Sequence, residues 1–203
     1  AAEPSQPAVA VVGMEARFGA LLSLREFQEA ALAGRAPSNR LAADLRVAPS
    51  AYRIPPKELA EMLPQQVLML QTADAALRDA GNLSRDHERT GVFIGMELDS
   101  RTADFHFRWS LPEDLREAAG PALSANRTMG ALGGIIASRI AREFKIGGPS
   151  FTIAADETAG LRALEAAAGA LRRGELDCAV VGAVDVSERE GSSGRGEVPP
   201  RGE

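Results

Sequence analysis

Glu157 is the residue of this chain whose type and position could do chemistry. It follows a short apolar run with β-branched residues, Ser150 to Ala155, and it precedes leucines and alanines at helical spacing. This pattern predicts a buried strand that turns sharply into a helix at Asp156 and Glu157. Free backbone N–H groups and the positive end of the helix dipole gather at such a turn, so a carboxylate or a thiolate is stabilised there. A glutamate is nevertheless a weak nucleophile, because its acyl adduct would be an anhydride.

The other side chains that could act as nucleophiles, bases or metal ligands are few. His87 and His106 lie in polar loops and have no neighbour in sequence that would form a base dyad, which favours exposed loop histidines. Cys178 lies in an apolar run and is predicted to be a small buried residue. A single thiol cannot form an internal disulfide, and no CxxC or HxxxH spacing occurs, so neither a metal nor another cofactor is expected.

Composition describes one ordinary soluble α/β domain. The 203 residues are 45% hydrophobic and 25% charged, which is enough to bury a core. The net charge is −5, and no basic cluster alternates with aromatic residues, so a nucleic-acid partner is not expected. We find no signal peptide and no apolar segment near the ~20 residues that span a bilayer. The sequence therefore predicts a cytoplasmic chain with no membrane partner.

Strand and helix patterns alternate along the chain and position Glu157. The alternation predicts a layered α/β sheet with right-handed crossovers. Ser23 is a candidate N-cap, and Glu26 completes its capping box. Residues 1–7 are expected to be a linker, residues 8–186 one domain, and residues 187–203 a flexible tail or interrupted loop. The predicted strands are residues 8–13, 90–95, 150–155 and 177–186, and the predicted helices are residues 24–32, 64–80, 123–144 and 158–173.

Several local sequences resemble the N-terminal half of a β-ketoacyl synthase, the condensing enzyme of fatty-acid and polyketide assembly lines. The resemblance spans residues 8–186. Residues 52–56 and 105–109 narrow it to ketosynthase-like domains of polyunsaturated-fatty-acid and related polyketide synthases. The matching segments are Val11-Val12-Gly13-Met14 with Arg17-Phe18, Met62-Leu63-Pro64-Gln65-Gln66, Ala125-Asn126-Arg127, Arg139-Ile140-Ala141, residues 147–153, Gly174-Glu175-Leu176-Asp177 and residues 179–186.

The resemblance implies a thiolase-like α/β fold, a layered and mostly parallel sheet flanked by helices, in a chain that ends before the second half of that fold. It implies that the family's nucleophilic cysteine falls on Glu157. It also implies that the two catalytic histidines of the family lie in the second half of the fold, and neither His87 nor His106 matches their motifs. Condensing activity is therefore not expected of this chain.

Three functions stay open at this point. The first is a non-condensing, structural module comparable to a chain-length factor. The second is a malonyl-carrier decarboxylase that resembles loading-module ketosynthases, in which glutamine replaces the cysteine. The third is a fragment of a longer β-ketoacyl synthase. Glu157 itself also has a purely structural interpretation, because acidic residues stabilise the first turn of a helix by ~0.3 to 1 kcal/mol.

Partners follow from the implied fold. Half of a thiolase-like fold leaves an apolar face bare, and the small residues of helix 158–170 suit burial on every side. We expect either a homodimer across the strand that holds Phe151, Thr152 and Ile153, or association with other synthase domains. Arg139, Arg142 and Lys145 recur on one helical face and are a candidate docking site for an acidic acyl carrier protein.

Overall fold

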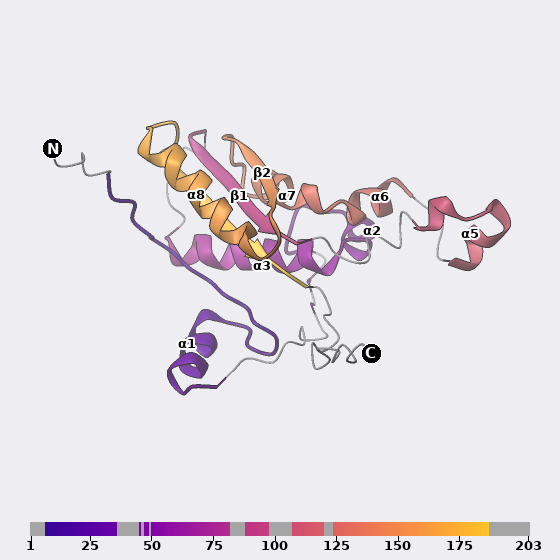
Figure 1. The fold of residues 1–203 in the computed structure, drawn as a ribbon, viewed down its shortest axis with the longest axis horizontal. Coiled ribbons are helices and arrows are strands. Elements are labelled where there is room, and N and C mark those ends of the chain that lie inside the picture. The colour runs from indigo at the N-terminus through magenta and orange to yellow at the C-terminus, as the bar shows by residue number, and fades with distance from the viewer. Residues whose placement is uncertain are drawn as a thin grey trace, which may run out of the picture.

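The computed structural model describes residues 7–35, 45, 47–48, 50–81, 88–97, 107–119 and 124–186. Its centre is a parallel three-stranded sheet (Figure 1) made of β1 (Thr90–Met96), β2 (Ser150–Ala154) and β3 (Cys178–Val184). The strand order is β2-β1-β3, and β1 pairs in parallel with both neighbours. The predicted α/β architecture with a parallel sheet flanked by helices is confirmed.

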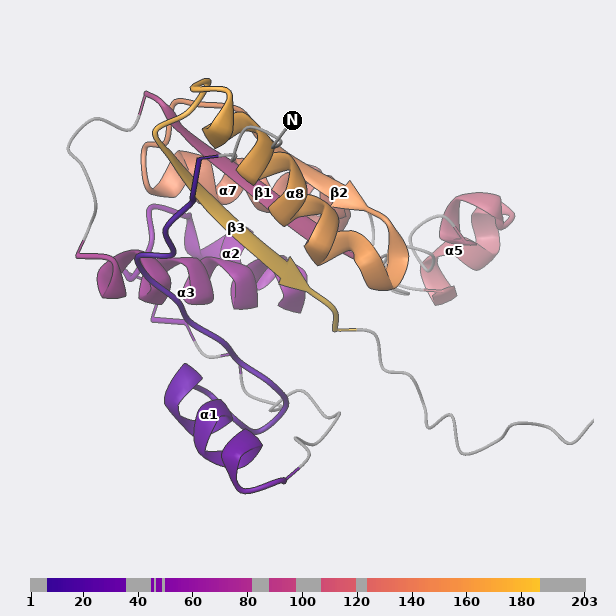
Figure 2. The same ribbon diagram turned by 60° about the vertical axis from the view of Figure 1, so that its left-hand side comes forward.

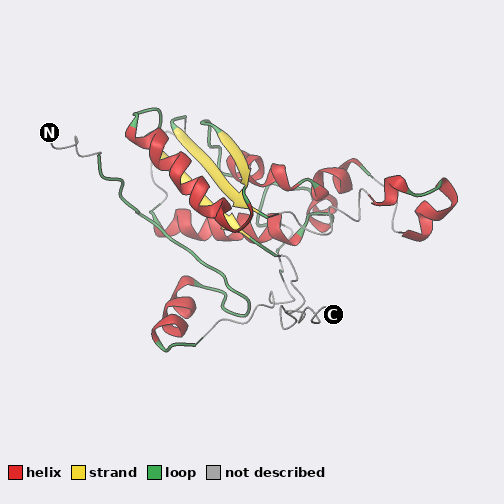
Figure 3. Cartoon of the chain, in the orientation of Figure 1, coloured by secondary structure: helices red, strands yellow, loops and turns green. Residues whose placement is uncertain are grey.

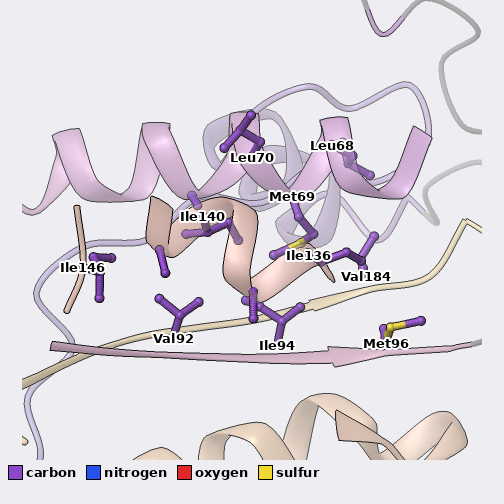
Figure 4. Packing of buried hydrophobic residues seen from close by; sticks show 13 residues of the cluster. Leu68, Met69, Leu70, Val92, Ile94, Met96, Ile136, Ile140, Ile146 and Val184 are labelled. Carbon is purple, nitrogen blue, oxygen red and sulfur yellow. The ribbon is translucent and has the colours of Figure 1, made fainter. Parts of the chain in front are cut away.

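Helices cover both faces of the sheet. Helices α3 (Pro64–Asp79) and α7 (Ile136–Glu143) lie on one face, and α8 (Ala159–Arg172) lies on the other (Figure 2). Side chains alternate along β1, so Val92, Ile94 and Met96 join the core beneath α3 and α7 (Figure 4), whereas Phe93 packs with the alanines of α8. Every residue of β1 is buried. The central strand is therefore enclosed by two separate apolar clusters.

The predicted strand at residues 8–13 is wrong, because the described segment 7–17 has no strand and does not join the sheet. The segment instead lies against the end of α3, where the Met14 N–H donates to Asp79 at 2.9 Å. A Cβ on Gly13 would fall 2.5 Å from the Ala76 carbonyl oxygen, so glycine permits this approach. Val11 stays 72% exposed.

The predicted helix at residues 123–144 is divided into three pieces (Figure 3): α6 (Ala125–Ala131), the 3-10 turn η1 (Gly133–Ile135) and α7. Leu132 has extended backbone angles and interrupts the helix. A Cβ on Gly133 would fall 2.2 Å from Cε of Met96, so the missing side chain lets the turn approach the end of β1. Contact with the sheet therefore outweighs the helical periodicity of the apolar residues.

The described chain has further helices besides those that cover the sheet. Helix α1 (Leu24–Leu32) is confirmed, and its predicted cap is present, since the Glu26 N–H donates to Ser23 Oγ at 3.3 Å. The short helices α2 (Pro56–Ala60) and α5 (Glu113–Ala119) were not predicted. Figure 1 and Figure 2 both place α1 and α5 away from the sheet. Among the helices that the structure describes, none has the length and apolar character to cross a bilayer.

Candidate functional site at the turn between strand and helix

The predicted sharp turn that holds Glu157 is confirmed. Strand β2 ends at Ala154, and a 3-10 turn, η2 (Asp156–Thr158), leads directly into α8. Asp156 has φ of 46°, a left-handed conformation that is uncommon outside glycine. The hydroxyl and the N–H of Thr158 both donate to the Ala155 carbonyl, at 2.8 and 3.0 Å, and close the turn. The structure leaves Glu157 exposed on this turn.

Close backbone contacts fix the position of this turn. A Cβ on Gly95 would fall 2.4 Å from the carbonyl carbon of Ala159, so β1 touches the first residue of α8 without an intervening side chain. A Cβ on Gly160 would fall 2.8 Å from Cβ of Ala183 on β3. The start of α8 therefore rests on β1 and β3 through residues with little or no side chain, which holds Glu157 above the end of the sheet.

The turn lies where open parallel sheets bind ligands. The chain leaving β1 returns to β2 through α7, and the chain leaving β2 returns to β3 through α8, on the opposite face (Figure 2). The strand order thus reverses between the carboxyl ends of β1 and β2, and ligands of such sheets bind outside the carboxyl ends at that point. Glu157 follows the carboxyl end of β2. A carboxylate at this place can accept hydrogen bonds or a proton.

Strand β2 was predicted as a buried strand, but it is a partly exposed edge strand. Its outer edge has no strand partner among residues described here, and Phe151 is 43% exposed. The ring of Phe151 meets Phe93 edge to face, with centroids 4.9 Å apart. Phe151, Thr152 and Ile153 pair with residues 93–95 of β1 and were predicted to form a dimer strand. That prediction stays a proposal.

The small residues of α8 were predicted to suit burial on every side and to be left partly bare in this half of the fold, and the described chain does leave one side of α8 uncovered. Ala163 and Ala167 face the sheet and are at most 1% exposed, whereas Leu161 and Leu164 are 69% and 52% exposed on the outer side. An ion pair between Arg162 and Glu165, at 2.8 Å, lies on that outer side as well. Small residues therefore identify the inner face of α8, and the outer face carries leucines without a described neighbour to cover them.

The predicted carrier-docking set is only partly exposed. Arg142 and Lys145 are exposed at the end of α7 and just beyond it. Arg139 is buried, and its guanidinium Nη1 lies 2.6 Å from Oε1 of Glu58 on α2. Arg139 thus cannot be part of an exposed docking surface, because Glu58 draws it into the interior. The partner is 81 residues away in sequence, so helical periodicity alone did not predict it.

The remaining candidate residues that the structure describes form no second centre. His87 and His106 lie outside the described residues. Cys178 is half-buried at the start of β3, which is less buried than predicted. Within the part of the chain that the structure describes, no cluster of histidine, cysteine, aspartate and glutamate could hold a metal ion.

Two adjacent glutamines are buried at the start of α3, and neither was assigned a role from the sequence. Gln65 and Gln66, in the first turn of α3, are each 1% exposed. Nε2 of Gln66 donates to the carbonyls of Met129 and Leu132, at 3.4 and 3.1 Å, and so holds the end of α6 beside η1. The signal that could have revealed them is a pair of polar residues placed directly after Pro64 at the start of an apolar helix.

Tyr52 marks the margin of the core that covers the α3 face of the sheet. Burial raises the pKa of Tyr52 to about 12, and the neighbouring Asp74 carboxylate acts in the same direction. The ring packs against the cluster beneath α3 and α7. On the same helix, Gln71 accepts a hydrogen bond from Nη1 of Arg17 at 2.8 Å. These contacts attach residues 17 and 52 to α3.

Residues 6–196 match the model of the β-ketoacyl synthase N-terminal domain. The chain belongs to the β-ketoacyl synthase family. It represents the N-terminal half of the thiolase-like fold of that family. The replacement of the family's cysteine by Glu157 is implied by the resemblance of the local sequence and stays a prediction.

Curated relatives of this β-ketoacyl synthase domain are parts of large synthases. The chain is 26% identical over 217 residues to one subunit of a polyunsaturated fatty acid synthase of Thraustochytrium sp., and it covers 10% of that protein with 88% of its own length. It is 34% identical over 144 residues to polyketide synthase 2 of Metarhizium anisopliae, covering 6% of it with 68% of its own length. The chain thus spans about a tenth or less of these relatives.

Solved structures show the same fold at low identity. A structure described as the PfaC keto synthase-chain length factor matches with a TM-score of 0.65 and 23% identity, over 91% of this chain and 25% of that one. The ishigamide ketosynthase/chain length factor matches with a TM-score of 0.63 and 24% identity, over 86% of this chain and 52% of that one. These similarities establish the ketosynthase fold and nothing about activity.

Proposed function

We propose that this chain is a non-condensing ketosynthase-like module of a fatty-acid or polyketide synthase and acts in the manner of a chain-length factor. The observation that carries the proposal is the carboxylate of Glu157 on the turn between β2 and α8, at the carboxyl end of the sheet. A condensing enzyme needs a nucleophile that forms a stable acyl intermediate. A carboxylate would form an anhydride instead, so acyl transfer through residue 157 is not expected.

The exposed apolar features of the domain support a role in assembly. The outer edge of β2, with Phe151 43% exposed, offers backbone groups to a second strand. The outer face of α8, with Leu161 69% exposed, offers an apolar surface. We propose that these surfaces contact a second copy of the chain or other synthase domains. The curated relatives, in which such a segment is a small part of a long chain, support partners of this kind.

An acyl carrier protein is a further proposed partner. Arg142 and Lys145 are exposed near the end of α7 and form the remaining part of the predicted docking set. Acidic carrier surfaces are attracted to such cations at moderate ionic strength. Reversal of both charges, as Arg142→Glu with Lys145→Glu, is expected to weaken carrier binding, and unchanged binding would contradict this partner.

Malonyl-carrier decarboxylation is the second candidate function. A glutamine at position 157 could donate a hydrogen bond to a developing oxyanion, whereas an ionised glutamate only accepts and repels the malonyl carboxylate. Glu157 therefore argues against decarboxylation in the wild-type chain.

The deciding experiment compares the wild-type chain with Glu157→Ala, Glu157→Gln and Glu157→Cys, using malonyl-carrier and acyl-carrier substrates. We expect wild type to release no CO₂ above the uncatalysed rate and to form no acyl-enzyme, as followed by mass spectrometry of the intact protein. Glu165→Gln is the matched control, because Glu165 is an exposed glutamate on α8 with an ion-pair partner of its own.

The outcomes separate the two candidate functions. Decarboxylation by wild type that is lost in Glu157→Ala, but kept in the Glu165→Gln control, would overturn the non-condensing proposal in favour of the second candidate. An acyl adduct on wild-type Glu157 would overturn both. If the chain is a fragment of a longer synthase, addition of the downstream sequence restores the fold but leaves these results at residue 157 unchanged.

A further inference from the structure

A polar junction lies where α2 meets α6 and α7, on the face of the sheet opposite α8. Arg139 on α7 pairs with Glu58 on α2 at 2.6 Å, and Ser124 just before α6 donates to Glu61 just after α2 at 2.9 Å. Helices α2 and α6 are in contact, and α7 covers β1 and β2. We call these four residues the α2 junction. It belongs to a different face of the domain from the turn that holds Glu157.

The guanidinium of Arg139 is incompletely bonded. Its side chain is 7% exposed, and Nη1 makes the ion pair with Glu58. Nε and Nη2 are buried and have no hydrogen-bond partner among the described residues. These two nitrogens share one edge of the planar group, and together they form the fork that binds the two oxygens of a carboxylate. The unbonded atoms are thus a complete bidentate donor set.

Two buried donors of this kind need a hydrogen-bond acceptor. A buried ion pair repays its desolvation only when additional hydrogen bonds satisfy the remaining protons, and a buried donor without an acceptor destabilises the folded chain. The Glu58 carboxylate contributes one oxygen to Nη1 and is itself 16% exposed, so it keeps contact with water. The donors that need an acceptor are therefore on Arg139 and not on its partner.

We propose that the Nε and Nη2 edge of Arg139 is a binding site for a small carboxylate. A planar carboxylate matches the guanidinium fork with two parallel hydrogen bonds. The occupant is small because only 7% of the side chain is accessible, which leaves no approach for a protein side chain carried on a folded surface. The bound anion shares the guanidinium with Glu58. This site goes beyond the proposed function of the module and does not depend on it.

The experiment titrates the whole chain with sodium acetate and follows both its thermal unfolding and the Arg139 Nε–H resonance by NMR. Sodium chloride at equal ionic strength corrects for screening. We expect acetate to raise the unfolding temperature above the chloride series and to shift the Arg139 resonance in a saturable manner, because a ligand that binds only the folded state stabilises it. Phosphate is run as a separate arm to distinguish a carboxylate site from a general oxyanion site.

Three variants locate the site. Arg139→Lys keeps the charge but loses the fork, so acetate affinity is expected to fall at least tenfold. Arg142→Lys makes the same change one turn later on α7 at an exposed position and is expected to leave affinity unchanged. Glu58→Gln removes the competing anion and is expected to tighten acetate binding, since one negative charge no longer opposes the ligand.

The proposal is overturned if acetate shifts the Arg139 Nε–H resonance of wild type no further than chloride does. That result would mean that interior water alone satisfies the Nε and Nη2 donors. It is also overturned if Arg139→Lys binds acetate as tightly as wild type, or if phosphate binds more tightly than acetate. The wild-type resonance decides the question even if Arg139→Lys does not fold.

Discussion

The two faces of the sheet are packed in different ways. Beneath α3 and α7 the core consists of branched and long side chains such as Ile94, Ile136 and Ile140, none more than 1% exposed (Figure 4). Beneath α8 it consists mostly of alanines, with Phe93 and Leu176. Large side chains fill space between elements held apart, whereas small ones let a helix backbone rest on the sheet. One face therefore resists loss of volume, and the other resists gain of volume.

The largest expected effect comes from removing volume under α7. Ile140→Ala should lower the free energy of unfolding by about 2 to 5 kcal/mol, because Ile140 is fully buried and its removal leaves a cavity. Ile140→Val, measured beside it by urea unfolding, should cost about 0.5 to 1.5 kcal/mol. A loss below about 0.5 kcal/mol for Ile140→Ala would mean that α7 does not pack tightly on β1 in solution.

Adding volume on the α8 face should also destabilise the domain. Gly95→Ala places a methyl group 2.4 Å from the Ala159 carbonyl carbon, and a backbone atom cannot rotate away as a side chain can. We expect a loss of about 1 to 3 kcal/mol in the free energy of unfolding, as for overpacked cores. Gly134→Ala is the control, because its nearest neighbour, Oγ1 of Thr152, would be at 3.7 Å. Equal stability of both variants would contradict the close contact between β1 and α8.

This contrast also separates what the sequence could predict from what it could not. Local signals were sufficient for α1, since the Ser23 cap and the helical period lie within one segment, and for the turn at Glu157. The apolar run at residues 8–13 has the pattern of a strand, but no local feature says that Gly13 and Met14 lie against the end of α3 and that the run stays outside the sheet.

Long-range contacts account for the other errors. The break at Gly133 arises from Met96, and the burial of Arg139 arises from Glu58, which lie 37 and 81 residues away in sequence. The candidate turn could be predicted because strand and helix are consecutive in the chain. The α2 junction could not, because the residues that meet there come from distant segments.

The stability of the domain should fall at alkaline pH because of Tyr52, at the margin of the α3 face. Tyr52 has a pKa of about 12 in the folded chain, raised by burial and then by Asp74, against an ordinary value of 10.0. The unfolded chain therefore loses this proton first, and stability is lost as pH rises from about 10 toward 12. Tyr52→Phe should show less of this loss in urea unfolding at about pH 9 and about pH 11. Identical pH dependence of the two proteins would contradict the raised pKa.

The smallest expected effect lies on the outer side of α8. Leu161 is 69% exposed, so Leu161→Ala should change the free energy of unfolding by no more than about 0.5 kcal/mol, as surface substitutions usually do. The same substitution should reduce binding of a hydrophobic dye, because it removes exposed apolar surface. A loss above about 1 kcal/mol that grows with protein concentration would instead show that a second copy covers this face. The outer face of α8 would then be exposed only in the separate chain and would be covered in the assembled form.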